Sequence, residues 1–470
     1  MSSHEPSGPN PDQAAVNLPP VTTGQSQPSR RAFLAGTAGA LALTALGAKA
    51  LAGVQPAPAA ITPRPPAPAA MPKCAPRTPV NAGQAIKMAV IGTGGMGTNH
   101  CSSFIALHKA GKEQLEIVAL ADVNQRNLAK AKGVCETGQG NTVETFTDYR
   151  KLLARQDING VLIASPEHWH AQMAIDALVA GKDVYLEKPM TLKLDEALRV
   201  RELVKANPDL RLQVGTQMTN MPKFHRAREV IAAGTIGTPV WSQTSYCRNS
   251  KDGEWNYYLL DPDLKPGVNL DWEGWCGPGG AAPWDPKVYA RWRRYRHWST
   301  GIIGDLLVHV VTPMLVAIGE KVGWPTRVTA SGLHCVDKAM ENHDQVNITV
   351  EFEHDHTMII AGSTCNETGL ETRIRGNKGN IDLNSRHCIV RPERIYAEEL
   401  DEKRIDCPDI GNDQDVHRVK WLKCVRDREM PDSDVDQGSK VMVIVDLATR
   451  SMWDGGAYTF NPKTMTAARQ

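Results

Sequence analysis

The sequence lacks the motifs of several functional classes. None of its ten cysteines forms a Cys-x-x-Cys pair, which excludes a zinc ribbon and a thioredoxin-like dithiol motif. The formal net charge is only +1, from 53 basic and 52 acidic side chains. A nucleic-acid or anionic-lipid partner would require a basic excess, so we expect neither. With 470 residues, 41% of them hydrophobic, the chain can form one large or two ordinary domains.

The first 85 residues differ from the rest of the chain. Residues 1–29 are polar and contain several Pro, Ser and Gln, a composition typical of disorder. The segment Ser29–Leu34 (SRRAFL) then precedes an Ala/Gly/Leu stretch without charged residues that ends at Ala48. This pattern resembles a twin-arginine export signal, with small-residue cleavage sites at Ala48–Ala50 and Ala57–Ala59. The alternatives are a chance Arg-Arg pair before a short apolar helix and a retained membrane anchor.

We therefore interpret residues 1–53 as a signal region. Residues 54–85 contain nine prolines and are interpreted as an extended linker. The expected location is the periplasm, with membrane contact only through the export signal.

A candidate dinucleotide-binding loop begins the folded part of the chain. The apolar run Met88–Ile91 is typical of a buried parallel strand and leads directly into a GxGxxG motif. In such a motif, Gly92 allows a tight turn, Gly94 lets the pyrophosphate approach, and Gly97 permits close helix packing. The phosphates would then lie at a helix N-terminus. The candidate cofactor-binding residues of this loop are Gly92, Gly94, Gly95, Met96 and Gly97.

A second predicted strand carries an acid that favours NAD. The run Ile117–Ala121 ends in Asp122, which can accept hydrogen bonds from a ribose hydroxyl and would repel a 2′-phosphate. The alternative is a solvated aspartate at a strand end. Arg126 and Lys130 follow closely and can accommodate a phosphate, so NADP remains open.

Three further apolar runs follow at intervals that fit helices. They are Val161–Ala164, Val184–Leu186 and Leu212–Val214, with amphipathic helices predicted at Ala171–Ala180 and Leu194–Lys205. Alternation of strand and helix predicts a doubly wound parallel sheet, an α/β fold. Such sheets bind ligands beyond the carboxyl ends of their strands, so the residues that end these runs should face one crevice.

The sequence resembles the Gfo/Idh/MocA oxidoreductase family, named for glucose–fructose oxidoreductase and inositol dehydrogenase. The resemblance is strongest to the exported branch of this family. The resemblance extends from Ile86 to the C-terminus. It is carried by the GxGxxG motif and by the segments Ser165–His170 (SPEHWH), Glu187–Pro189 (EKP), Gly234–Gly237 (GTIG), Asp271–Trp275 (DWEGW) and Gly304–His309 (GDLLVH).

The resemblance implies two domains. A Rossmann domain at residues 86–214 would be followed, at 215–470, by a catalytic α+β domain with a large, mostly antiparallel open sheet. The alternating apolar and polar residues of Val346–Phe352 independently predict a strand with one buried face. His354–His356 then fits a polar hairpin tip better than a metal site, and Arg375–Asn380 fits a second hairpin turn. No metal is expected.

The resemblance also implies catalytic roles for Lys188, Asp305 and His309. An ammonium group at Lys188 would stabilise a developing alkoxide, and His309 would act as the base. Asp305 and His309 are four residues apart and would share one helix face, so that the carboxylate could fix the imidazole tautomer. The alternatives are a Lys188–Glu187 ion pair and a structural His309. Thr312 replaces an acid found in many family members, which leaves the substrate class open.

Further candidates follow from the same comparison. The predicted cofactor contacts beyond the glycine loop and Asp122 are Ser165, Pro166, His168, His170, Glu187, Lys188 and Gln217. A competing role for His170 is to cap a helix that begins at Ala171. Seven of the eleven tryptophans lie between Trp241 and Trp298, where aromatic faces can stack on sugar rings. The predicted substrate contacts in this segment are Arg294, Tyr295 and His297.

The leading expectation is an exported NAD(P)-dependent oxidoreductase of a sugar, polyol or sugar derivative with a tightly bound cofactor. The first alternative is a glycoside hydrolase that oxidises its substrate transiently and returns the hydride. The second alternative is a non-catalytic, nucleotide-bound sugar sensor or scaffold. The family resemblance also implies a homo-oligomer, a dimer or tetramer.

Overall fold

The computed structural model describes residues 71–470. The predicted signal region and residues 54–70 of the predicted linker lie outside the described residues. All ten cysteines lie within the described part, and each is a free thiol there.

A six-stranded, fully parallel sheet forms the first half, as predicted. The strand order is β3-β2-β1-β4-β5-β6, which is the order of a doubly wound sheet. Five of the strands lie where the apolar runs predicted them, and the short edge strand β3 was not predicted. The strands are β1 (Ile86–Ile91), β2 (Leu115–Ala121), β3 (Glu144–Phe146), β4 (Gly160–Ile163), β5 (Asp183–Leu186) and β6 (Leu212–Val214).

Helices cover both faces of this sheet. Successive side chains of a strand point to opposite faces, and here both faces carry apolar side chains that the helices bury. In β1, Met88 and Val90 belong to one buried cluster, whereas Ala89 and Ile91 belong to another. The first cluster also contains Trp421, which comes from α10 (Asp413–Asp427) near the end of the chain. The other helices of this half are α1 (Gly95–Lys109), α2 (Gln125–Gln139), α3 (Tyr149–Leu153), α4 (Glu167–Val179) and α5 (Leu194–Ala206).

The second half contains a ten-stranded sheet in the order β14-β13-β12-β11-β7-β10-β9-β8-β15-β16. Only the β7–β10 pair is parallel, so the prediction of a mostly antiparallel sheet is confirmed. Both predicted hairpins form, with β9 paired to β10 and β11 paired to β12. The strands are β7 (Pro239–Cys247), β8 (Pro325–Leu333), β9 (Gln345–Phe352), β10 (Thr357–Ser363), β11 (Arg373–Gly376), β12 (Gly379–Asp382), β13 (Cys388–Pro392), β14 (Lys403–Ile405), β15 (Tyr458–Asn461) and β16 (Thr466–Arg469).

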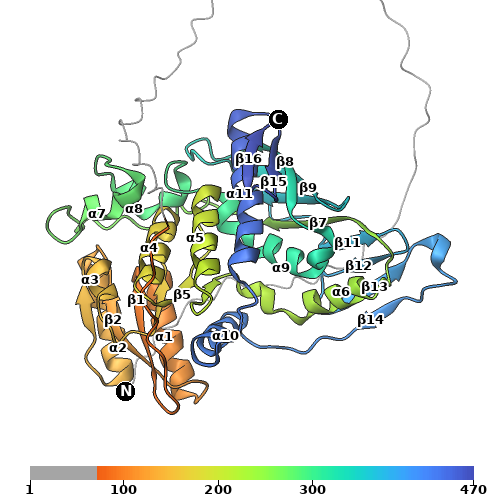
Figure 1. The fold of residues 1–470 in the computed structure, drawn as a ribbon. Helices are drawn as coiled ribbons and strands as arrows, with labels where there is room; N and C mark the ends of the chain where they lie inside the picture. Colours follow the sequence, from red (N-terminus) through yellow and green to blue (C-terminus); the bar gives the residue numbers. More distant parts are fainter. Residues whose placement is uncertain (1–70) are drawn as a thin grey trace, which may run out of the picture. The chain divides into compact units, whose positions relative to one another are not determined.

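Three long helices pack beside this sheet. The longest, α11, packs against β8 and β15 of the large sheet and also against α5 of the first half (Figure 1). A long insert between β7 and α9 contains short helices. The helices are α6 (Pro222–Ala232), α9 (Val308–Ile318) and α11 (Val435–Asp454), and in the insert α7 (Trp272–Cys276) and α8 (Pro286–Ala290).

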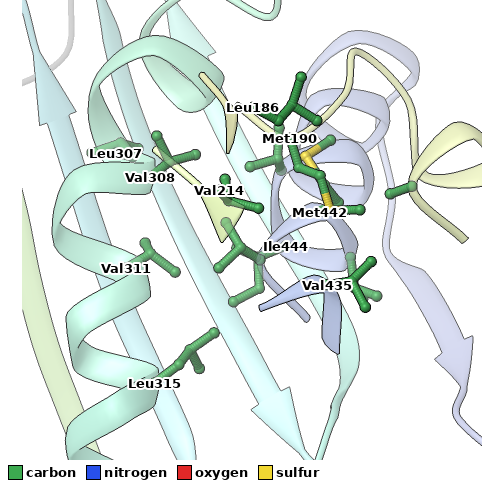
Figure 2. Close-up of a cluster of buried hydrophobic side chains, with 14 of the residues drawn as sticks. Leu186, Met190, Val214, Leu307, Val308, Val311, Leu315, Val435, Met442 and Ile444 are labelled. Atoms are coloured by element: carbon green, nitrogen blue, oxygen red, sulfur yellow. The ribbon is translucent and has the colours of Figure 1, made fainter. Parts of the chain in front are cut away.

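One apolar cluster joins the two halves. Figure 2 shows Leu186 at the end of β5, Met190 in the loop after β5 and Val214 in β6 packed near Val308 of α9 and Ile444 of α11. Because these residues are at most 2% exposed, the cluster fixes the ends of β5 and β6 against the second domain.

Within residues 71–470, one helical stretch, 303–322, is long and apolar enough to span a membrane by length and composition. About 78% of its most apolar window is buried inside the protein.

We expect Ile444→Ala to lower the free energy of unfolding by about 2–5 kcal/mol, because the truncation leaves a cavity in the cluster that joins the halves. Ile395→Ala is the matched control, because Ile395 is 73% exposed and its truncation should change stability by less than about 0.5 kcal/mol. Urea unfolding of both variants tests this expectation, and equal midpoints would contradict it.

Candidate active site

The glycine loop leads into the N-terminus of α1, and the space in front of this helix end is open to an anion. Gly92 has φ +84°, and Gly94 is the N-cap of α1. A Cβ on Gly97 would lie 1.9 Å from the Gly92 carbonyl oxygen, so the helix approaches the strand as the motif predicts. A Cβ on Gly94 would meet only the Asn127 side chain at 3.9 Å. The free N–H groups of the helix end and the space before them fit a pyrophosphate.

Asp122 lies at the end of β2 and is held by the glycine loop. Its Oδ2 accepts hydrogen bonds from the Thr93 backbone N–H (2.6 Å) and hydroxyl (3.1 Å), and its Oδ1 accepts from the Asn124 N–H (2.8 Å). Burial raises the pKa of Asp122, and these hydrogen bonds oppose that effect. The half-buried carboxylate therefore lies beside the phosphate loop, where a ribose hydroxyl would be bound.

The predicted catalytic residues Lys188 and Asp305 form a buried ion pair. Lys188 Nζ donates to the Asp305 Oδ1 at 2.7 Å and to the Asp305 carbonyl oxygen at 2.8 Å. Lys188 follows β5 of the first domain, whereas Asp305 lies in a π-helical turn, Ile303–Leu307, that runs into α9 of the second domain. The two halves of the chain thus contribute opposite charges to one cluster.

Two more side chains hold Asp305. Arg293 Nε donates to Asp305 Oδ1 at 2.8 Å, and Trp255 Nε1 donates to Oδ2 at 3.2 Å. Burial would raise the pKa of Asp305, but the charges of Arg293 and Lys188 outweigh it and hold this pKa well below its usual range. Trp255 is 1% exposed and has φ +58°, a left-handed conformation that is costly for a bulky residue and typical of functional sites.

His309 faces this cluster as a neutral imidazole. Burial lowers its pKa to about 3, and the charge of Lys188 acts in the same direction. The ring is half-buried, lies 6.2 Å from the Tyr246 ring, and has no hydrogen bond to any residue in the described part of the chain. The predicted Asp305–His309 bond is also not formed, because Lys188, Arg293 and Trp255 occupy the carboxylate. A neutral imidazole with open nitrogens can accept a proton.

Glu187 is held from behind the site. Arg418 Nε donates to His100 Nδ1 at 3.0 Å, which leaves the other ring nitrogen of His100 to donate to Glu187 Oε1 at 2.9 Å. Burial alone would raise the pKa of Glu187, but the hydrogen bond from His100 and the charge of Lys188 lower it. The Lys188–Glu187 ion pair, which was the alternative to a catalytic Lys188, does not form; instead the Lys188 backbone N–H donates to Glu187 Oε2 at 3.1 Å.

The histidines after β4 have structural contacts. Helix α4 begins at Glu167, four residues earlier than predicted, so His170 lies in its first turn and does not cap it. The His170 ring contacts the carbonyl oxygens of Ser165 (2.9 Å) and Pro189 (2.6 Å), which ties the β4–α4 loop to the loop after Lys188.

The His168 side chain contacts the insert. It contacts the Trp275 carbonyl oxygen at 2.9 Å and packs against the Trp275 and Trp298 rings. The other predicted cofactor contacts lie at strand ends of the first sheet. Ser165 and Pro166 follow β4, and Gln217 begins a short helical turn after β6.

The predicted substrate residues do not gather at the cluster. Arg294 is buried and donates to both carboxylate oxygens of Asp337, at 2.6 and 2.9 Å, which is a structural role. His297 is exposed and contacts the Gly279 carbonyl oxygen at 2.7 Å, and Tyr295 is half-buried in the same segment. The arginine that reaches the site is Arg293, one residue earlier. No periodic pattern distinguishes Arg293 from its neighbours in the sequence, because the insert is irregular.

The insert lies across the first domain at two places. At the end of β2, the Gln125 N–H donates to the Asn269 carbonyl at 2.9 Å, and the Asp271 N–H donates to the Val123 carbonyl at 3.0 Å. At α4, Trp169 Nε1 donates to the Trp275 carbonyl at 2.8 Å. The insert thus contacts both sides of the crevice where a dinucleotide would lie.

Two cavities, of about 510 and 350 Å³, lie at other places. Neither is lined by a predicted site residue. The larger is lined by Lys87, Glu116, Val118, Lys132, Thr142, Val143, Glu144, Thr145, Arg155 and Asp157, and the smaller by Arg373, Arg375, Asn380, Asp382, Arg391, Pro392 and Glu393.

Two family models match most of the described chain. Residues 86–216 match an oxidoreductase family with an NAD-binding Rossmann fold, and residues 281–460 match the C-terminal alpha/beta domain of the same family. The protein belongs to the Gfo/Idh/MocA oxidoreductase family. Its first domain is therefore an NAD-binding Rossmann domain, as the open glycine loop also indicates.

Individual relatives are distant. The chain is 30% identical to the uncharacterized oxidoreductase YrbE of Bacillus subtilis over 297 residues, which cover 62% of this chain and 71% of YrbE. It is 30% identical to inositol 2-dehydrogenase of Rubrobacter xylanophilus over 190 residues, or 40% of this chain and only 47% of that enzyme. Among solved structures, levoglucosan dehydrogenase in complex with NADH and levoglucosan has a TM-score of 0.61 at 19% identity, covering 80% of this chain and 99% of that one.

We expect Gly97→Ala to weaken NAD binding by about tenfold or more, because the new Cβ would displace the glycine loop from its position against α1. Gly133→Ala in α2 is the matched control, because a Cβ there meets nothing within 4 Å and should add about 0.5–1 kcal/mol of stability. Equilibrium titration with NAD measures both variants, and equal affinities would show that this loop does not hold the cofactor.

Proposed function

We propose that this chain is an exported NAD-dependent oxidoreductase that oxidises a CH–OH group of a sugar, polyol or sugar derivative with a tightly held cofactor. The observation that carries the proposal is the buried Lys188–Asp305 pair beside the neutral ring of His309. This cluster lies at the carboxyl end of β5, where a parallel sheet of this type binds its ligand.

Oxidation of an alcohol needs a hydride acceptor, a base and a group that stabilises the alkoxide. The nicotinamide ring supplies the hydride acceptor when bound. His309 is neutral above about pH 3 and can take the hydroxyl proton. Lys188, held in place by Asp305, has the charge that stabilises the developing alkoxide. Arg293 and Trp255 position Asp305, and through it the ammonium group.

The substrate class is supported by the relatives. Inositol 2-dehydrogenase and levoglucosan dehydrogenase act, by their names, on a polyol and on a sugar derivative. The insert beside the site is rich in tryptophan, and aromatic faces stack on the C–H faces of such rings.

Tight cofactor binding is supported by the contacts of the insert. It contacts the ribose end of the crevice at Gln125 and the α4 end at Trp169, so release of a dinucleotide would require these contacts to open. Arg126 forms ion pairs with Asp261 (3.3 Å) and Asp263 (3.2 Å) of the insert, which removes a cation that a 2′-phosphate would need and favours NAD. Export is supported only by the sequence of residues 29–59, which contains the Arg-Arg segment, the uncharged stretch and the small-residue cleavage sites.

We expect protein purified without added nucleotide to release NAD or NADH on denaturation, seen as absorbance at 260 or 340 nm. Incubation of this protein with a panel of sugars and polyols should then reduce the retained cofactor. Release of reducing sugar from glycosides without NADH formation would instead identify the hydrolase alternative. A protein that retains no nicotinamide would contradict the tight-binding part of the proposal.

We expect Lys188→Ala and His309→Ala each to lower kcat by about 10²–10⁴-fold, because each removes a group that acts on the reacting hydroxyl. Cofactor binding should change only a few-fold. Lys463→Ala and His354→Ala are matched controls at exposed positions, and they should leave the rate unchanged. Single-turnover reduction of the cofactor at 340 nm measures the effect, and a near-normal rate in either site variant would remove that residue from the mechanism.

A further inference from the structure

A further carboxyl group lies at this site and has no role in the mechanism above. Glu167 is the first residue of α4, directly beyond the carboxyl end of β4, and is 1% exposed. Its Oε2 accepts a hydrogen bond from the Thr300 hydroxyl at 3.3 Å, and the Ser299 hydroxyl lies close enough to lower the pKa of the carboxyl. Its Oε1 is buried without a hydrogen-bond partner among residues 71–470.

The backbone of the catalytic turn leaves room for this carboxyl. A Cβ on Gly304 would lie 3.1 Å from Glu167 Oε2 and 3.3 Å from Pro189 Cγ. Since Pro189 follows Lys188 and Gly304 precedes Asp305, the carboxyl of Glu167 is enclosed between the two loops that form the central ion pair.

The charge of Glu167 sets the net charge of the cluster. Lys188 and Arg293 are the cations that act on it, and Asp305 is an anion whose pKa lies well below the usual range. The net charge of these four groups is therefore +1 when Glu167 is protonated and zero when it is ionised. His168 and His170 are on the same helix, and their rings contact backbone carbonyls.

The surroundings of Glu167 place the pKa of its carboxyl near neutral pH. Burial raises its pKa to about 7 and Asp305 adds to this effect, whereas the Ser299 hydroxyl, Arg293 and Lys188 oppose it. A change of one nearby charge would therefore change its protonation.

We propose that Glu167 takes up one proton when the nicotinamide ring in the crevice beside it is reduced. This inference rests on the proposed function. Oxidation of the alcohol breaks a C–H and an O–H bond, with the C–H electron pair and hydrogen going to the ring as hydride. The O–H proton remains on the protein, and its final position is Glu167. Reduction removes the positive charge of the ring, so the carboxylate loses a stabilising cation and its proton affinity rises.

A stored proton suits a cofactor that stays bound. The return half-reaction reduces a carbonyl compound and needs a hydride and a proton together. The site would supply both from within, with the Thr300 and Ser299 hydroxyls as the polar contacts of the buried carboxyl.

The experiment is a redox titration of the cofactor-loaded protein against a mediator at several pH values on either side of pH 7. If one extra proton is taken up, the ratio of reduced to oxidised cofactor at a fixed potential changes by a further factor of ten for each pH unit. For a two-electron couple this is about 30 mV per pH unit of additional slope in the midpoint potential. We expect this extra slope in the wild type and its loss in Glu167→Gln, which is close to isosteric with the protonated acid.

Asp446→Asn is the matched control, because Asp446 is also a buried carboxyl with a raised pKa but pairs with Arg450 in α11. It should retain the wild-type slope. Equal slopes in the wild type and Glu167→Gln would overturn this inference and leave the proposed function intact. A protein that binds no nicotinamide would overturn both.

A second measurement covers the case in which Glu167→Gln fails to fold. The reduced-minus-oxidised infrared difference spectrum of the wild type should gain the carbonyl band of a protonated carboxyl. Absence of this band would overturn the inference without any variant.

Discussion

The site depends on one buried ion pair, Lys188 with Asp305, whose members come from different domains. Removing two charges from water is costly, and attraction between them offsets the cost only when their remaining polar atoms are also bonded. Here Asp305 accepts from Arg293 and Trp255, and Lys188 also donates to the Asp305 carbonyl. The pair therefore exists only while the loop after β5 and the turn before α9 are held together.

The apolar packing around the pair provides that restraint. Met190, two residues after Lys188, belongs to the cluster that includes Leu307 and Ile444 (Figure 2). The His170 ring, through the Ser165 and Pro189 carbonyls, fixes the same loop from the other side. Close packing thus brings a lysine and an aspartate together that are 117 residues apart in the sequence.

Periodic patterns allowed most of the fold to be predicted, and irregular segments account for what was missed. Short, mainly apolar runs located five of the six strands of the first sheet, because buried parallel strands need them. The edge strand Glu144–Phe146 has no such run. The spacing of Asp305 and His309 suggested a shared helix face, but the π-helical turn changes the phase and directs the carboxylate to Lys188. In the aperiodic insert, nothing in the sequence distinguished Arg293, which reaches the site, from Arg294, which pairs with Asp337.

Burial and the division of charge in the cluster together explain why His309 stays neutral beside an aspartate. An isolated carboxylate would raise the pKa of the ring, but the charge of Asp305 is shared with two cations, and Lys188 repels a second positive charge nearby. Before the hydride moves, alcohol oxidation requires a neutral base that can take the hydroxyl proton. It also requires a cation that stabilises the alkoxide, and here that cation is held in place by its ion pair. The ion pair therefore both binds the domains' loops to each other and, together with burial, keeps the base neutral.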